Sequence, residues 1–166
     1  MTRAFLSLGS NLGDRLAYLR AATAALGRGP RTTVIGTSKV YETVPVEVEE
    51  EQPCYLNCVV ELECGLPAME LLRYCQGIEA ALGREGKGEK APRTLDIDVL
   101  LFGDGTIVVE PDLLVPHAGV TREFNLRALA DLDADLYIPG RGTVRELLAR
   151  AEDGGIRTFG EAEELC

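Results

Sequence analysis

The order of strand-like and helix-like segments is the feature that most constrains how this chain can fold. Stretches rich in apolar and β-branched residues predict four strands, at 3–10, 32–43, 55–64 and 94–103. Apolar residues at helical spacing predict a helix after the first strand, from Asp14 to about Leu26, and another after the third, from Pro67 to a stop at Gly83. The chain therefore follows the order βαββαβ.

This order is typical of a two-layer α/β (α+β) sandwich with a ferredoxin-like core. Asp104 and Gly105 suit a tight hairpin turn from the fourth strand into the apolar stretch at 106–110. Helices predicted at 122–131 and 144–152 are C-terminal elements appended to the core. With 166 residues, 46% of them hydrophobic, we expect a single domain over 1–166 with its own core.

The composition argues against several classes of partner. Seventeen Lys and Arg against 27 Asp and Glu give a net charge of −10, which argues against duplex nucleic acid or an anionic membrane as the main partner. The five cysteines form no CxxC pair and the chain has one histidine, so we expect reduced thiols in a cytoplasmic protein rather than a zinc site. The apolar run at 4–8 is too short for a membrane span or a signal peptide.

Two aspartates stand one residue apart in the apolar segment "TLDIDVLLFG". Side chains alternate along a strand, so Leu95, Ile97 and Val99 face one way while Asp96 and Asp98 face the other. Mg²⁺ prefers oxygen ligands and is usually held by one or two carboxylates plus substrate phosphates. Two carboxylates on one face can bridge two such ions during displacement at phosphorus. The same pattern is also common on the solvated face of a half-buried sheet.

A basic loop containing several glycines precedes this strand. The segment "GREGKGEKAPR" at 83–93 carries two arginines and two lysines against two glutamates. Its glycines allow the movement that is needed to close over a polyphosphate and exclude water. Such loops are also common as solvated connections. The succession of a basic loop, a Pro-Arg pair and paired aspartates nevertheless favours a phosphoryl-transfer site.

These segments resemble a known family, the 6-hydroxymethyl-7,8-dihydropterin pyrophosphokinases of folate biosynthesis. The segment "PRTLDIDVLLFG" is very similar to the signature of that family. The resemblance extends over nearly the whole chain. Other matching pieces occur in the same order, namely "LSLGSNLGDR", "VYETVPV", "QPCYLNCVV", "IEAALGR", "VPH" and "REF".

The resemblance implies transfer of the β,γ-pyrophosphoryl unit of ATP to the pterin hydroxymethyl oxygen, with release of AMP. Asp96 and Asp98 would hold two Mg²⁺ ions that bridge the ATP phosphates. The implied catalytic residues are Arg84, Arg93, Asp96 and Asp98. The implied ATP contacts are Gln76, Glu79, Arg84, Arg93, Val99, His117 and Arg122. By spacing alone, Gln76 and Glu79 are ordinary surface residues of a helix.

The pterin is a flat heterocycle with a fixed donor and acceptor edge, which suits aromatic faces above and below it and an amide in its plane. By resemblance, Tyr55 and Phe124 are the stacking pair and Asn57 is the in-plane amide. The implied pterin contacts are Thr43, Val44, Val46, Tyr55, Asn57, Asp96 and Phe124. Without the resemblance, Tyr55 and Asn57 share one strand face and Phe124 is a core residue.

The chain departs from the family pattern in the basic loop and around its histidine. It contains no Trp, and Lys90 stands where the family has a tryptophan before the Pro-Arg pair. Gly86 replaces a second arginine of the loop. Ala118 follows the histidine where some members have an aromatic residue, and Asp112 lies where some carry an arginine. These differences bear on loop closure and phosphate binding.

We consider three hypotheses for the function, in this order. The first is an active pyrophosphokinase, monomeric and cytoplasmic, that uses ATP, two Mg²⁺ ions and 6-hydroxymethyl-7,8-dihydropterin. The second is a pterin- or nucleotide-binding protein of the same fold that is catalytically weakened by its altered loop. The third is a ferredoxin-like regulatory domain in which the paired aspartates are only a polar sheet face.

Overall fold

The computed structural model describes residues 1–44, 54–83, 94–152 and 154–159. The strands are β1 (Thr2–Ser10), β2 (Thr32–Thr37), β3 (Tyr41–Thr43), β4 (Tyr55–Cys64), β5 (Asp96–Phe102), β6 (Ile107–Val109), β7 (Leu113–Val115), β8 (Tyr137–Ile138), β9 (Gly142–Thr143) and β10 (Arg157–Thr158). The helices are α1 (Arg15–Gly27), α2 (Ala68–Ala81), α3 (Glu123–Asp133) and α4 (Val144–Arg150).

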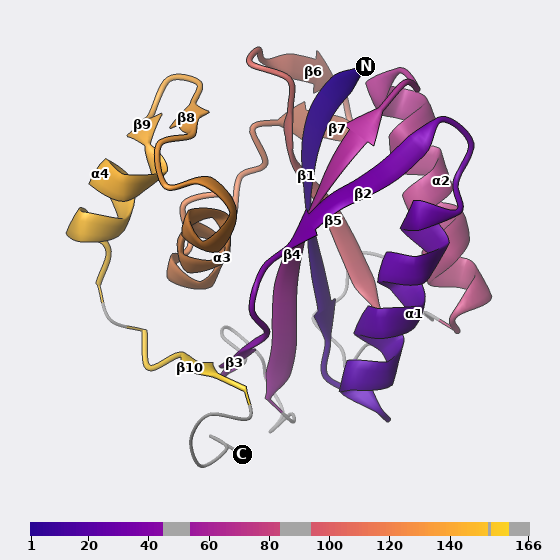
Figure 1. The fold of residues 1–166 in the computed structure, drawn as a ribbon, viewed down its shortest axis with the longest axis horizontal. Helices are drawn as coiled ribbons and strands as arrows, with labels where there is room; N and C mark the ends of the chain where they lie inside the picture. Colours follow the sequence, from indigo (N-terminus) through magenta and orange to yellow (C-terminus); the bar gives the residue numbers. More distant parts are fainter. Residues whose placement is uncertain (45–53, 84–93, 153, 160–166) are drawn as a thin grey trace.

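The main sheet is antiparallel, with the strand order β10-β3-β4-β1-β5 and β2 also paired with β4. Helices α1 and α2 lie on one side of this sheet, and α3 lies on the other (Figure 1). The predicted mixed α+β class is confirmed. The strand order is compatible with a ferredoxin-like core, since the first predicted strand (β1) lies between the third (β4) and the fourth (β5).

The local signals for the helices act largely as predicted. The Asp14 carboxylate accepts a hydrogen bond from the Ala17 N–H at 3.1 Å and so caps α1. Pro67 immediately precedes α2, where its missing N–H costs no helical hydrogen bond. Gly83 follows α2 with φ of +88°, a conformation that glycine adopts without steric strain.

Two strand predictions are wrong. The segment 32–43 forms two strands because it bends at Ser38, whose N–H donates to Val59 O while its hydroxyl accepts from the Val59 N–H. The segment after Asp104 and Gly105 does not form a hairpin with β5. It contains β6, which pairs with β7, while the outer edge of β5 is used elsewhere, for example by the His117 N–H that donates to Leu100 O.

The two faces of the main sheet form separate hydrophobic cores. The core under α1 and α2 includes the inward residues of the central strands and of β5, among them Leu6, Leu8, Leu56, Leu62, Ile97 and Val99. The core under α3 includes Phe5, Tyr41, Val59, Leu100, Leu101, Leu126 and Leu129. The predicted alternation of β5 is confirmed, because Leu95, Ile97 and Val99 are buried whereas Asp96 and Asp98 are only half-buried.

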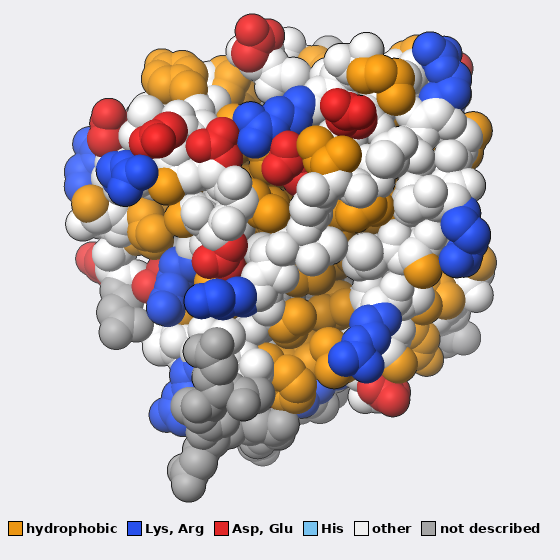
Figure 2. Space-filling model, in the orientation of Figure 1, with side chains coloured by type: hydrophobic (Ala, Val, Ile, Leu, Met, Phe, Trp, Pro, Cys, Tyr) orange, Lys and Arg blue, Asp and Glu red, His pale blue; other side chains and the backbone are white. Residues whose placement is uncertain are grey.

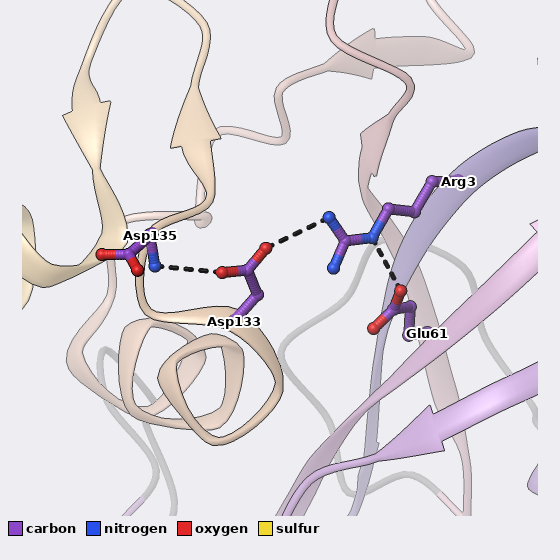
Figure 3. Close-up of polar contacts among 4 residues, drawn as sticks. All are labelled: Arg3, Glu61, Asp133 and Asp135. Atoms are coloured by element: carbon purple, nitrogen blue, oxygen red, sulfur yellow. Dashed lines mark hydrogen bonds and ion pairs between the residues drawn. The ribbon is translucent and has the colours of Figure 1, made fainter.

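Arg3 fastens α3 to the sheet. Its Nε donates to the carboxylate of Glu61 on β4 at 2.7 Å, and a terminal nitrogen lies 3.1 Å from the carboxylate of Asp133 at the end of α3 (Figure 3). These contacts raise the pKa of Arg3, with the Glu61 hydrogen bond as the largest cause. Acidic and basic side chains lie next to one another over this part of the surface (Figure 2).

The cysteines differ from prediction at one position. Cys54 is disulfide-bonded, so the expectation that every thiol is reduced is wrong for this residue. The argument from sequence relied on an odd count and a missing CxxC pair, and neither excludes a single disulfide. Cys58, Cys64 and Cys75 are free and buried. Burial raises the pKa of Cys58 and Cys75 to about 12, which makes both thiols poor nucleophiles.

The described helices show no membrane segment. None of them is both long enough and apolar enough to cross a bilayer.

Candidate functional site

Asp96 and Asp98 lie on the face of β5 that α1 and α2 leave uncovered. In the register with β1, Asp96 stands opposite Gly9 and Asp98 opposite Ser7. Within the described residues no three acidic, histidine or cysteine side chains gather as they do in a protein-only metal cage. Two carboxylates suit Mg²⁺ without such a cage, because this ion usually keeps water and phosphate oxygens among its ligands.

His117 lies beside these carboxylates. Its Nε2 is 3.6 Å from Asp98 Oδ1, and its Nδ1 accepts a hydrogen bond from the Gly119 N–H at 2.9 Å. Burial lowers the pKa of His117; the Asp96 charge opposes this shift and the Arg122 charge adds to it. The lowered pKa favours the neutral ring, and because Nδ1 accepts a hydrogen bond, the proton of the neutral ring lies on Nε2, the nitrogen nearer Asp98.

A cavity of about 240 Å³ opens next to the aspartates. The residues that line it come from α2, β5 and the segment 111–118, and they are Leu72, Ile97, Asp98, Val99, Pro111, Asp112, Leu113, Leu114, His117 and Ala118. Most of the lining residues are apolar, and Asp98, Asp112 and His117 bring polar groups to the cavity. This combination suits a flat apolar base attached to a charged phosphate chain.

A second group of polar residues lies on the neighbouring strands of the same face. Gly9 on β1 stands between Asp96 on β5 and Asn57 on β4. The Asn57 amide donates from Nδ2 to the Thr43 hydroxyl at 2.7 Å, and both side chains are buried. A Cβ at Gly9 would lie 2.8 Å from Asn57 Oδ1 and 3.6 Å from Tyr55 Cδ1. Because Gly9 has no side chain, the Asn57 amide can lie close over the backbone of β1, on the strand face that Asp96 shares.

Phe124 and Arg122 lie at the start of α3, where the chain leaves the histidine segment. The Arg122 guanidinium stands 4.6 Å from the centre of the Phe124 ring, a cation–π distance. Phe124 is half-buried and belongs to neither core, so the alternative interpretation of it as a core residue is wrong. Arg122 is exposed and close enough to act on the pKa of His117.

Comparison with known proteins shows the family to which the chain belongs. The family model described as 7,8-dihydro-6-hydroxymethylpterin-pyrophosphokinase matches residues 5–134. The chain belongs to this family. A curated 2-amino-4-hydroxy-6-hydroxymethyldihydropteridine pyrophosphokinase of Methylorubrum extorquens is 42% identical over 157 residues, which cover 94% of this chain and 98% of that protein. One from Bacillus subtilis is 44% identical over 130 residues, covering 78% of this chain and 77% of that protein.

Solved structures show the same fold. A crystal structure of Plasmodium falciparum HPPK-DHPS superposes with a TM-score of 0.72 at 17% identity, over 89% of this chain and 45% of that longer chain. The family and the enzyme class predicted from sequence are thus confirmed. Nothing in these findings favours a weakened binding protein, and membership of an enzyme family disfavours a purely regulatory domain.

The structure brings together many of the residues that the pyrophosphokinase resemblance implied. Asp98, Val99 and His117 share the cavity. Asp96 lies in one row of the sheet with Asn57, while Thr43 and Tyr55 adjoin that amide. The residues Val46, Arg84 and Arg93, and the altered loop positions Gly86, Lys87 and Lys90, lie outside the described residues.

Three other residues implied by the resemblance, Gln76, Val44 and Glu79, belong neither to the cavity lining nor to this row of the sheet. Gln76 is exposed on α2, and Val44 has 53% of its surface exposed at the end of β3. Glu79, expected at the surface by spacing and at ATP by resemblance, is only 4% exposed. Its carboxylate accepts a hydrogen bond from the Ile97 N–H at 3.0 Å. The surface interpretation of Glu79 is therefore wrong.

Sequence reasoning missed two parts of the site. Gly9 was quoted only within a matching segment, although its missing side chain lets the Asn57 amide lie close over β1. The apolar wall formed by Leu72, Leu113 and Leu114 was not predicted. The available signal for the wall was the apolar stretch "LLV" directly before the Pro-His pair.

Proposed function

We propose that this chain transfers the β,γ-pyrophosphoryl unit of ATP to the hydroxymethyl oxygen of 6-hydroxymethyl-7,8-dihydropterin. The hydroxymethyl oxygen bonds to the β-phosphorus while the bond from that phosphorus to the α,β-bridging oxygen breaks. AMP leaves with that electron pair, and the hydroxyl proton passes to water. The observation that supports the proposal is the single row in which Asp96, Gly9 and Asn57 stand on three neighbouring strands, because the groups proposed to bind the metal and the pterin then lie on the two sides of β1.

Asp96 and Asp98 are proposed to hold two Mg²⁺ ions. Both side chains are half-buried on one strand face, so they can bind a cation while the remaining coordination positions stay open to phosphate oxygens. When bound, the ions offset the negative charge of the triphosphate and align it for displacement. Protein groups then act mainly by positioning, since phosphoryl transfer needs little covalent chemistry from the enzyme.

The cavity beside β5 is the proposed site of the nucleotide base. Val99 and the leucines of its wall give an apolar surface, and His117 in its lining can donate from Nε2 to a phosphate oxygen. Arg122 supplies a positive charge close to that histidine. Arg84 and Arg93 stay predicted phosphate contacts, together with Gln76 at the exposed side of α2.

The proposed site of the pterin ring is the strand face over Gly9, between Asn57 and Asp96, which we call the pterin recess. Thr43 accepts from the Asn57 amide and so fixes its orientation, which leaves Oδ1 facing the recess as an acceptor for the ring edge. Tyr55 borders the recess, and Phe124 is proposed as the second stacking face. Val44, Val46 and Asp96 complete the proposed contacts.

The proposal is tested by AMP release from ATP and Mg²⁺, with and without 6-hydroxymethyl-7,8-dihydropterin, with Asp96→Ala as the blank. We expect pterin-dependent AMP from the wild-type chain and none above background from the variant. ATP and pterin binding without AMP formation would instead identify a binding protein. Size-exclusion chromatography with light scattering checks the predicted monomer over 1–166, and cell fractionation checks the predicted cytoplasmic location.

A further inference from the structure

Glu79, an ATP contact by resemblance, is a buried acid to which the mechanism proposed above gives no role. It lies in the last turn of α2, where the partial negative charge of the helix C-terminus disfavours a carboxylate. With 4% of its surface exposed, it also loses most of its hydration. Both effects oppose an acid at this position, so its contacts within the protein must compensate for them.

The partner of Glu79 lies between the two proposed metal ligands. Strand β5 pairs only with β1 among the described strands, so half of its backbone groups point outward from the sheet edge. Glu79 Oε2 accepts the outward N–H of Ile97 at 3.0 Å. Hydrogen bonds to a charged acceptor are among the stronger ones in proteins, and this one ties α2 to the residue that joins Asp96 to Asp98.

The pKa of Cys75 responds to the charges of both Glu79 and Asp98. The Cys75 thiol, one helical turn before Glu79, has its pKa raised first by burial and then by the negative charges of Glu79 and Asp98 among others. Glu79 therefore lies at the outer edge of β5, beside the residue that joins the two aspartates. From there it acts on the strand backbone through this hydrogen bond.

We propose that Glu79 is a positioning residue for the metal site: by holding the Ile97 N–H it fixes the outer edge of β5 and thereby the directions of the Asp96 and Asp98 carboxylates. This inference rests on the proposed function, because it assumes that the aspartates bind the catalytic cations. Groups that orient metal ligands from behind are often nearly as important as the ligands themselves. A free strand edge has no such constraint and lets the two carboxylates move independently.

The test compares Glu79→Gln with Glu79→Met. Glutamine keeps an oxygen that can accept the Ile97 N–H, whereas methionine has similar size and helix propensity but accepts only weakly. The matched control is Glu70→Ala, which removes an exposed acid from the same helix. Binding of Mn²⁺ in the presence of ATP, followed by electron paramagnetic resonance, reports the metal site directly, and pterin binding is measured in parallel.

We expect Glu79→Met to weaken Mn²⁺ binding by about 10- to 100-fold, the usual cost of losing a group that orients a metal ligand. Glu79→Gln should stay within about threefold of wild type, since the hydrogen bond survives at lower strength. Pterin binding should be unchanged in both variants. Equal losses in Gln and Met would overturn the proposal in favour of a direct role for the charge, and no loss in either would also overturn it.

A second measurement does not depend on the stability of the methionine variant. Hydrogen exchange of the Ile97 amide in the wild-type chain should be slow, although this amide lies on the outer edge of the sheet. Exchange as fast as that of an exposed edge amide would exclude the bond. If the wild-type chain made no pterin-dependent AMP, the proposed function would fail, whereas Mn²⁺ binding and Ile97 exchange would still decide the role of Glu79.

Discussion

One face of the main sheet is used in two different ways along its length. At one end, α3 covers β1, β4 and β5, and side chains such as Phe5, Val59 and Leu101 form a closed core. At the other end, no described helix covers the same three strands, and Gly9, Asn57 and the aspartates stand in their place. The strands run continuously between the two ends (Figure 1), but the register of β5 with β1 shifts between them, and both Leu100 and Leu101 belong to the core under α3.

The difference shows that strand periodicity alone does not separate a core from a site. Alternation determines which residues share a face, and a covering helix determines whether that face is apolar. The part of the face that α3 covers extends as far as the N-terminus of this helix, where Arg122 and Phe124 lie. The proposed pterin and metal groups begin just beyond it, so rigid packing at one end supports the polar groups at the other.

The largest expected effect comes from removing a polar group at the end of the sheet face that no described helix covers, which we call the open end. Asp98→Ala should reduce pterin-dependent AMP formation by about 10²- to 10³-fold, as expected from losing several kcal/mol of charge stabilisation. Unfolding temperature should change little, since the carboxylate is only half-buried and shares its strand face with the like charge of Asp96. Steady-state kinetics and a thermal melt measure the two quantities. Full activity in both Asp96→Ala and Asp98→Ala would remove the metal site.

The next effect tests the recess itself. Gly9→Ala places a methyl group 2.8 Å from Asn57 Oδ1, and the amide cannot move away easily because it is buried and bonded to Thr43. We expect the KM for the pterin to rise about tenfold, with the KM for ATP nearly unchanged, which corresponds to about 1.4 kcal/mol of lost binding. An equal rise in both constants would show that Gly9 supports the whole sheet rather than the pterin recess.

Elements with a long, consistent pattern could be predicted from the sequence. Strand β4 begins and ends at the predicted residues 55 and 64, because a segment rich in apolar and β-branched residues lies between Pro53 and Gly65 in the sequence. The faces of β5 were also predicted, since two aspartates among apolar neighbours fix the alternation. Family segments then pointed to His117 and Val99, which the fold brings to one cavity.

Features that depend on tertiary pairing could not be predicted. The bend at Ser38 relies on two hydrogen bonds to Val59, a residue far along the chain. Strand β6 pairs with β7 and not with β5, because the outer edge of β5 already accepts a hydrogen bond from the His117 N–H at Leu100 O. Glu79 has the spacing of a surface residue, and only the position of β5 against α2 makes it buried.

A smaller effect, on stability rather than activity, is expected at the end of the sheet face that α3 covers, which we call the closed end. Arg3→Met leaves the buried Glu61 carboxylate without its 2.7 Å partner and releases Asp133 at the end of α3 (Figure 3). Because the Arg3 side chain is 42% exposed, water screens part of the loss, and we expect a cost of about 1–2 kcal/mol. A thermal melt should show a fall of about 2–8 °C at unchanged turnover.

The matched control at this end is Arg145→Met. Its partner Asp135 is 81% exposed, so the pair is a surface ion pair near the same helix and its loss should barely change the melt. Equal effects of the two substitutions would show that Arg3 does not fasten α3 to the sheet. A loss of turnover in Arg3→Met would show instead that the closed end transmits strain to the site.

The smallest effect concerns the wall of the proposed nucleotide cavity. Asp112 lies on this wall near His117 and Ala118, where its negative charge opposes a phosphate chain. Asp112→Asn should therefore lower the KM for ATP by about two- to threefold, the size typical of one exposed charge interaction, and the gain should shrink as salt is added. Glu110→Gln removes the same charge two residues earlier but outside the cavity wall, so it should have less effect. If Asp112→Asn changed the KM for the pterin instead, the cavity would belong to the pterin, and the division of the open end into a base cavity and a ring recess would have to be reversed.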